Sequence, residues 1–288
     1  MVINEECKQC QIRQNINKYP EYATQGEIKS YQDAVRNIIE SCDGLSTPQI
    51  AEKMYSLRHE FWGADKEFSE IKRHFNDLML ASYPYMENKV RESEDHLRMA
   101  VQYAMVGNYI DFGALENVNE DELKNQLDGA ASIPVDTEIL ENFRNEILKA
   151  HRLVYFTDNC GEIVTDKLLI SVLQGINPDL DVTVIVRGKP VVNDATMEDA
   201  RQVRMEEVAH RIIDNGAGMP GNVIGAISPE AMDEVNEADL LVAKGQGNYE
   251  GLSECGLNIF YFFLCKCELF VRRFNVPQFT GVMVRELR

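Results

Sequence analysis

The α/β character of the chain is clearest in the stretch Leu153-Val154-Tyr155-Phe156-Thr157-Asp158-Asn159-Cys160-Gly161-Glu162. Its four leading residues are apolar and rich in β-formers, which predicts a buried strand. Polar residues follow at once, and a helical pattern of apolar residues then covers residues 162–173. A strand that passes directly into a helix is the unit from which parallel sheets are built.

Four more short apolar runs continue this pattern through the C-terminal half. They cover residues 182–186, 240–243, 259–263 and 282–284. Because helical patterns separate most of them, we predict an α/β fold with a mostly parallel sheet and flanking helices. Ligands of such sheets bind beyond the carboxyl ends of the strands.

The first half of the chain has a helical periodicity from about residue 22 to residue 150. One apolar set recurs at four-three-four spacing and consists of Ile50, Met54, Leu57 and Phe61. We predict that Thr47 caps this helix and that Pro48 is its first residue. We therefore expect a helical N-terminal region over residues 1–135 and an α/β domain over residues 136–288, joined near residues 128–136.

Composition restricts the possible partners. The 288 residues are 44% hydrophobic, which is enough for a sizeable core. The 47 acidic residues exceed the 29 Lys and Arg, and a net charge of −18 repels nucleic acid. Since no apolar run is long enough to cross a bilayer and no charged-then-apolar leader opens the chain, we expect a cytoplasmic protein without membrane or nucleic-acid partners.

Oxygen-bearing side chains follow two of the predicted strands. Asp158 and Asn159 come directly after the first, and Asp194 lies in the polar segment Arg187-Gly188-Lys189-Pro190-Val191-Val192-Asn193-Asp194-Ala195-Thr196 after the second. Hard divalent cations such as Mg²⁺ and Mn²⁺ prefer these ligands. The three residues therefore predict a metal site, and the alternative is that Asp158 and Asp194 only cap helices.

Two further segments contain several glycines. Asn215-Gly216-Ala217-Gly218-Met219-Pro220-Gly221 is a weak signal, because turns of this composition are common and it lacks the order of a phosphate-binding loop. Lys244-Gly245-Gln246-Gly247-Asn248-Tyr249-Glu250 follows the run at residues 240–243. A lysine at a strand end suits a point-charge contact to a phosphoryl group, although an ordinary solvated lysine is the alternative.

Together these segments resemble the damage-control phosphatase family, whose core is an acidic-residue-methyltransferase-like metal-binding domain. The matching residues are Asp158-Asn159, Gly161-Glu162, Arg187-Gly188-Lys189-Pro190, Asn193-Asp194-Ala195-Thr196, Asn215-Gly216, Lys244-Gly245-Gln246-Gly247-Asn248, Lys266-Cys267 and, in the helical half, Gly107-Asn108-Tyr109-Ile110-Asp111-Phe112. Cys7-Lys8-Gln9-Cys10 resembles the marker of the stand-alone prokaryotic branch.

The resemblance implies a Rossmann-like fold and metal-dependent hydrolysis of small phosphorylated metabolites, such as sugar phosphates that arise as damaged by-products. It implies Mn²⁺, Mg²⁺, Co²⁺ or Ni²⁺ on Asp158, Asn159 and Asp194, and catalytic roles for Asp158, Glu162 and Lys244. The substrate-binding residues that it implies are Asn108, Asp111, Arg187, Asn193, Gly245 and Lys266. Attack by an aspartate and attack by a metal-activated water both remain open.

Two other functions are alternatives. One is methyl transfer to acidic side chains, and the other is a non-catalytic sensor that binds a phosphorylated metabolite. The glycine-rich loop comes late in the α/β half instead of after its first strand, which is unlike a nucleotide-binding methyltransferase. Clustered metal-type ligands favour phosphoryl transfer.

The seven cysteines do not resemble a disulfide framework. Cys7 and Cys10 have the spacing of soft-metal ligands, and Cys265 and Cys267 would share one side of a strand that extended that far. A four-thiolate zinc site is one interpretation of these pairs. Buried structural thiols are the other, and we favour it because free cysteines are commonly buried.

Overall fold

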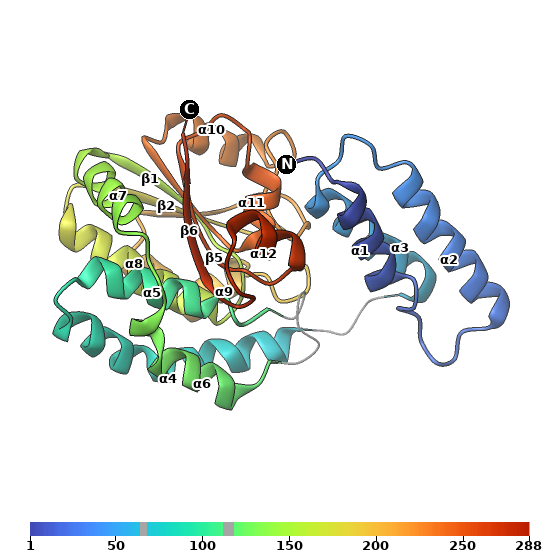
Figure 1. Ribbon diagram of the computed structural model, residues 1–288, viewed down its shortest axis with the longest axis horizontal. Coiled ribbons are helices and arrows are strands. Elements are labelled where there is room, and N and C mark those ends of the chain that lie inside the picture. Colours follow the sequence, from blue (N-terminus) through green and yellow to red (C-terminus); the bar gives the residue numbers. More distant parts are fainter. Residues whose placement is uncertain (64–67, 112–117, 288) are drawn as a thin grey trace.

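The computed structural model describes residues 1–63, 68–111 and 118–287, and a six-stranded sheet lies at its centre (Figure 1). The strand order is β3-β2-β1-β4-β5-β6. Neighbouring strands from β3 to β5 are parallel, and β6 is antiparallel to β5. The strands are β1 (Arg152–Phe156), β2 (Asp181–Val186), β3 (Arg211–Asp214), β4 (Leu240–Lys244), β5 (Ile259–Leu264) and β6 (Gly281–Glu286). The predicted α/β fold is confirmed.

Successive side chains of each strand point to opposite faces of the sheet, and helices cover both faces. Tyr155 and Val184 belong to one core, which includes α4 (Ser69–Glu92), α5 (His96–Gly107), α7 (Thr137–Lys149), α8 (Glu162–Ile176) and α9 (Met197–Gln202). Val154 and Ile185 belong to the other, with α10 (Pro229–Glu237), α11 (Gln246–Leu252) and α12 (Glu268–Phe274). The strands β1, β2, β4 and β5 are therefore buried on both faces, as their continuous apolar runs predict.

Three N-terminal helices form a smaller hydrophobic cluster of their own beside the sheet (Figure 1). They are α1 (Glu5–Asn15), α2 (Gln25–Glu40) and α3 (Thr47–Trp62), and α3 packs against α11. The next two helices, α4 and α5, lie instead in the core of the sheet and pack on α8. Packing therefore runs across residue 135, the predicted end of the helical N-terminal region. The remaining helix, α6 (Glu120–Asp128), precedes a short 3-10 turn.

Two local features differ from the sequence-based expectations. The helix α3 is capped by Ser46, whose backbone N–H donates to Gln49 Oε1 (3.0 Å), so Thr47 is already its first residue. A serine three residues before a glutamine forms a capping box, which outcompetes a cap at Thr47. The edge strand β3 was not foreseen, because two of its four residues are charged.

None of the helices in the described ranges is long and apolar enough to span a membrane.

Candidate active site

The predicted site residues gather at the carboxyl ends of β1, β2 and β4. The chain order of the strands reverses direction between β1 and β4, which makes this edge of the sheet a topological switch point. The loop after β1 carries Asp158 and Asn159, and the loop after β2 carries Asp194. Gly245 follows β4 directly. The sheet thus brings together residues that lie almost ninety positions apart in the sequence.

Backbone hydrogen bonds lock the loops after β1 and β2 against each other. The N–H of Cys160 donates to the carbonyl of Asn193 (2.8 Å), and the N–H of Ala195 donates to the carbonyl of Asp158 (2.8 Å). Asn159 and Asp194 form an isolated antiparallel bridge within this pairing. The side-chain amide of Asn193 donates to the carbonyl of Ile110 (3.0 Å), and its predicted contact to a substrate stays a prediction.

Arg187 joins the two aspartates. Its Nε donates to Asp194 Oδ2 (2.6 Å), and its second terminal nitrogen donates to Asp158 Oδ1 (3.3 Å). Both carboxylates therefore face one guanidinium, which is itself 1% exposed. The other terminal nitrogen of Arg187 is buried and has no hydrogen-bond partner among the residues that the structure describes. Such an orphaned donor is unusual in a protein interior.

Glu162 lies directly behind Asp158 at the start of α8. Its Oε2 accepts from Asn108 Nδ2 (2.9 Å) and from Asn159 Nδ2 (2.9 Å), and its Oε1 accepts from Lys244 Nζ (2.7 Å). The same two amides also donate to Asp158 Oδ2, at 3.1 Å and 2.8 Å. Asn108 and Asn159 thus hold the carboxylates of Asp158 and Glu162 in one fixed arrangement.

Lys244 is completely buried beneath this arrangement. Its ammonium donates to Glu162, to Asp166 Oδ1 (2.8 Å) and to the carbonyl of Ala104 (2.6 Å). Burial lowers the pKa of Lys244, but the charges of Asp166 and Glu162 outweigh burial and bring it to about 12. Because three acceptors already satisfy its three hydrogens, the ammonium is directed into the protein and fixes Glu162. The predicted contact of Lys244 to a phosphoryl group stays a prediction.

The ion pairs around the switch point have an excess of negative charge. They join five carboxyl groups to three cations, which are Asp111, Asp158, Glu162, Asp166 and Asp194 on one side and Arg187, Lys244 and Lys266 on the other. If all are ionised, two negative charges lack a partner in this network. This excess of two negative charges equals in magnitude the charge of one divalent cation.

The pKa values of the two aspartates reflect this excess. Burial raises the pKa of Asp158 well above its ordinary value, and the charges of Glu162 and Asp194 raise it further, while Arg187 lowers it. Burial raises the pKa of Asp194 to about 6, although Arg187 opposes the rise. A site that favours protonation for these reasons also favours a cation.

The donor set fits a hard divalent cation. Within the described ranges, neither Oδ1 of Asp194 nor Oδ1 of Asn159 accepts a hydrogen bond, so both oxygens remain available. With Asp158 they would supply two carboxylates and one amide oxygen. In the part of the chain that the structure describes, no group of three His, Cys, Asp or Glu side chains is placed for a metal, so a cation at this site would also need the amide oxygen of Asn159.

Gly245 lets β4 approach Asp158 closely. A Cβ atom at this position would lie 1.9 Å from Asp158 Oδ2, and the backbone φ is +81°. Both observations require glycine here. Beside it, Lys266 Nζ pairs with Asp111 Oδ2 (2.6 Å) at the rim, where the carboxylate side chain is 20% exposed. Phe112, the last residue of the matching helical motif, lies outside the described residues.

A chain of asparagine side chains, unforeseen as a unit, supports the strand-end loops. Asn215 Nδ2 donates to Asn222 Oδ1 (2.8 Å), and Asn222 Nδ2 donates to Asn248 Oδ1 (2.8 Å). Asn248 Nδ2 then reaches the carbonyl of Thr157 beside the first loop (3.1 Å). Asn215 and Asn248 belong to the matching motifs, but no spacing in the sequence indicates that Asn222 connects them.

The helix α4 also contributes residues that sequence reasoning missed. Asn76 Oδ1 accepts from the N–H of Gly161 (2.6 Å), and its Nδ2 donates to Asp199 (2.9 Å). Lys72 pairs with the same Asp199 (2.6 Å). These side chains anchor the starts of α8 and α9. The apolar periodicity of α4 predicts its buried face and gives no signal for polar residues on it.

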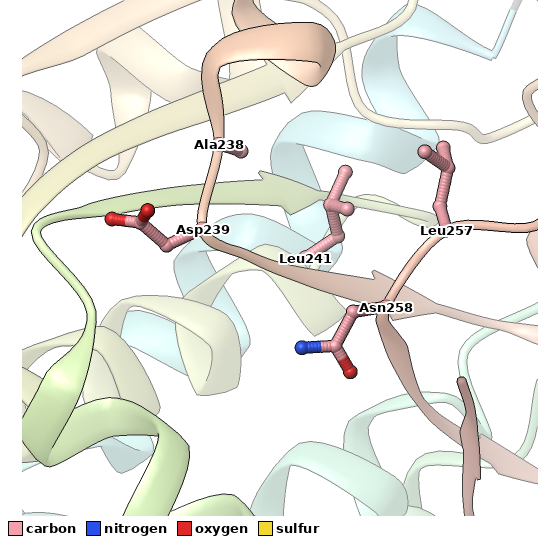
Figure 2. Close-up of a pocket in the computed structure, with 5 residues that line it drawn as sticks. All are labelled: Ala238, Asp239, Leu241, Leu257 and Asn258. Carbon is pink, nitrogen blue, oxygen red and sulfur yellow. The ribbon is translucent and has the colours of Figure 1, made fainter. Parts of the chain in front are cut away.

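A separate hollow of about 320 Å³ opens at the opposite ends of the strands (Figure 2). Ala238, Asp239, Leu241, Leu257 and Asn258 line it. The carboxylate of Asp239 is used by the backbone N–H groups of residues 151 and 152, at 2.8 Å and 3.0 Å. The hollow shares no residue with the cluster at the carboxyl ends, and we assign it no function.

Comparisons with known proteins agree with this geometry. A family model described as the damage-control phosphatase ARMT1-like domain matches residues 3–282. A damage-control phosphatase of Archaeoglobus fulgidus is 33% identical over 240 residues, which cover 83% of this chain and 81% of that protein. A damage-control phosphatase of Pyrococcus horikoshii is 30% identical over 294 residues, which cover 99% of this chain and 98% of that protein.

A crystal structure of a DUF89 family protein from Pyrococcus horikoshii superimposes with a TM-score of 0.81 at 25% sequence identity, and the match covers 99% of both chains. Its likeness extends over the N-terminal helices as well as the sheet. The family model spans nearly the whole sequence, and the strand-end residues that carry the resemblance converge at one switch point. The chain therefore belongs to the damage-control phosphatase family.

Proposed function

We propose that the chain is a metal-dependent phosphatase that hydrolyses phosphate monoesters of small metabolites, such as sugar phosphates. The observation that carries the proposal is the convergence of Asp158 and Asp194 on the single guanidinium of Arg187 at the switch point. Membership of the damage-control phosphatase family supports the general class of reaction. The two uncompensated negative charges of the ion-pair network support the need for a divalent cation.

Asp158, Asn159 and Asp194 would hold Mn²⁺, Mg²⁺, Co²⁺ or Ni²⁺ in this proposal. A bound divalent cation would supply the positive charge that neutralises phosphoryl oxygens during displacement. Arg187 orients both aspartates through its two hydrogen bonds, and its charge opposes the rise in their pKa values. The buried terminal nitrogen of Arg187 has no hydrogen-bond partner within residues 1–63, 68–111 and 118–287, so it is a candidate donor to an oxygen-bearing ligand.

Glu162 is a buried carboxylate with several hydrogen-bond donors around it. It accepts hydrogen bonds from Lys244, Asn108 and Asn159. We infer that it orients the amide of Asn159, whose other atom would face the cation, and that Lys244 acts by fixing Glu162. Lys266 and Asp111 lie at the rim, where an ammonium and a carboxylate suit the phosphate and the hydroxyl groups of a sugar phosphate.

The test is phosphate release from a panel of sugar phosphates, phosphopantetheine derivatives and nucleotides, with each cation in turn. We expect Asp158→Asn and Asp194→Asn to lose at least ~10³-fold in turnover, as for loss of a principal electrostatic group. Asp214→Asn is the matched control, since Asp214 also ends a strand but is exposed on β3. Unfolding free energies of all variants separate lost chemistry from lost folding.

Three further measurements distinguish the alternatives. Trapping of a phosphoenzyme that disappears in Asp158→Asn would identify Asp158 as the nucleophile, whereas its absence during turnover favours water. Transfer of a labelled methyl group without phosphate release would favour the methyltransferase. Saturable binding of phosphate esters without hydrolysis, across all the cations, would favour the sensor and would contradict our proposal.

A further inference from the structure

Three cysteines that the proposed reaction does not use lie near one another where α1 approaches the loop after β5. Cys7 and Cys10 lie on α1 with a spacing of three residues, which places them on one face of the helix. Cys267 follows β5 and immediately precedes α12. An ion pair between Glu6 and Arg272 ties the first turn of α1 to α12. The N-terminal thiols are thus held beside the loop that carries Cys267.

A buried carboxylate lies beside the same loop. Glu250 is 8% exposed, and the ammonium of Met1 donates to its backbone carbonyl (3.0 Å). The side-chain amide of Gln246 donates both to Glu250 Oε1 (3.4 Å) and to Cys267 Sγ (3.4 Å). The Glu250 carboxylate and the Cys267 thiol therefore share one donor, and the N-terminal ammonium is hydrogen-bonded to the backbone of Glu250.

The electrostatics of this cluster favour a cation. Burial raises the pKa of Cys7 to about 11, and the negative charges of Glu250, Cys267 and Cys10 contribute to the rise. Burial raises the pKa of Cys267, and the negative charge of Glu250 raises it further. Redox-active cysteines have a lowered pKa and a cationic neighbour, so this cluster has the opposite character. A cation would relieve the mutual repulsion of its anionic forms.

We propose that Cys7, Cys10, Cys267 and Glu250 form a second cation site, selective for a thiol-preferring divalent ion such as Zn²⁺. Three thiolates and one carboxylate match the four-coordinate, closed sites in which zinc has a structural role. Cys265 is not a member, since β5 ends at Leu264 and the Cys265 side chain is packed in the hydrophobic core beneath α11 and α12.

The site is completed on binding. Within the described ranges, no three His, Cys, Asp or Glu side chains are already placed to hold an ion. Cys7 and Cys10 are only partly buried, so their side chains can change rotamer when an ion binds. The cation would then fasten α1 to the loop between β5 and α12, next to Lys266 at the rim of the candidate active site.

Zinc content and thiolate ligation test this proposal on the full chain. After loading with Zn²⁺ under reducing conditions and removal of excess, we expect one zinc per chain by elemental analysis. Loading with Co²⁺ should give the near-ultraviolet charge-transfer absorption of cobalt thiolates, which oxygen-only sites do not give. Cys7→Ser and Cys267→Ser should each weaken zinc binding at least ~10-fold, as for loss of a metal ligand.

Matched variants make the test specific. Cys255→Ser changes another partly buried cysteine outside the cluster and should leave zinc content unchanged. Asp158→Asn should also retain this zinc, which separates the cluster from the proposed catalytic cation. Full zinc binding by the double variant that carries both Cys7→Ser and Cys267→Ser would overturn the proposal. So would a wild-type chain that binds no zinc, or one that forms a Cys7–Cys10 disulfide and binds none after reduction.

Discussion

The side chain of Lys244 combines a motif position with a structural role. The sequence predicts that it contacts a phosphoryl group, since it ends a strand ahead of two glycines. The structure adds that its ammonium is 0% exposed and neutralises Glu162 and Asp166 from within. Nothing in the sequence indicates these partners, because Asp166 lies one helical turn beyond Glu162 on α8 and appears as an ordinary helix residue.

Replacement of Lys244 by methionine should therefore lower the free energy of unfolding as well as activity. We expect a loss of about 3–5 kcal/mol, because Glu162 and Asp166 would remain buried without their cation. Denaturant unfolding followed by circular dichroism measures it. Lys189→Met, at an exposed lysine in the loop after β2, is the control and should change stability by less than about 0.5 kcal/mol. Equal stability of the two variants would contradict the structural role.

Glu250 predicts a pH dependence of stability in the metal-free chain. Burial raises its pKa from 4.5 to about 7, so the folded chain retains a proton that the unfolded chain releases between these values. Stability should therefore fall as pH rises from about 4.5 to 7, by up to roughly 3 kcal/mol from this group. Glu250→Gln should stabilise the metal-free protein, prepared with a chelator, at pH 8 and should have little effect on its stability at pH 4.5.

The control for this pH profile is Glu21→Gln, at an exposed loop position. It should leave the difference between pH 8 and pH 4.5 unchanged. If Glu250→Gln and Glu21→Gln give the same profile, Glu250 is not the source of the dependence.

At the scale of secondary-structure elements, the predictable part of the fold is the part with strong periodicity. Continuous apolar runs predict β1, β2, β4, β5 and β6 within two residues at most ends, because both faces of these strands are buried. The sequence pattern did not predict the strand β3, because it lies at the edge of the sheet, where Arg211 and Asp214 face solvent. The sequence pattern also did not predict the polar contacts of α4 with the starts of α8 and α9, since these contacts depend on tertiary packing.

The turn from β4 into α11 gives an element-scale prediction. Gly245→Ala should abolish most activity and destabilise the chain, because the new methyl group would overlap the carboxylate of Asp158. Gly225→Ala is a matched control, since its φ is +87° and no atom lies within 4 Å of a Cβ there. It should lose only the ~1 kcal/mol expected from a left-handed backbone. Initial rates and thermal unfolding of both variants provide the comparison.

On the scale of the whole molecule, charge couples folding to cations. The chain has a net charge of −18, and the buried network at the switch point contains two more carboxylates than cations. Mn²⁺ should therefore raise the unfolding free energy in a saturable way, by about 2.7 kcal/mol at a hundred times the dissociation constant. The increase should persist in Asp214→Asn and in 0.5 M NaCl, which screens diffuse attraction, and it should vanish in Asp194→Asn.

The sequence identified Asp158, Asn159 and Asp194 as a group because strands of a parallel sheet end at a common edge. It could not predict that Arg187 bridges the two carboxylates or that Asn222 links two motif asparagines. Such contacts depend on the crossing of loops in three dimensions, and a single chain without its fold contains no trace of them.

The glycines of the strand-end loops touch backbone to backbone. A Cβ at Gly188 would lie 2.5 Å from Gly216, and one at Gly221 would lie 2.6 Å from the carbonyl of Gly247. Loops in such contact cannot lengthen or diversify one at a time. A directed-evolution library intended to change substrate preference should therefore leave these turns intact and randomise the helical segments that border the rim, where new side chains displace no neighbouring main chain.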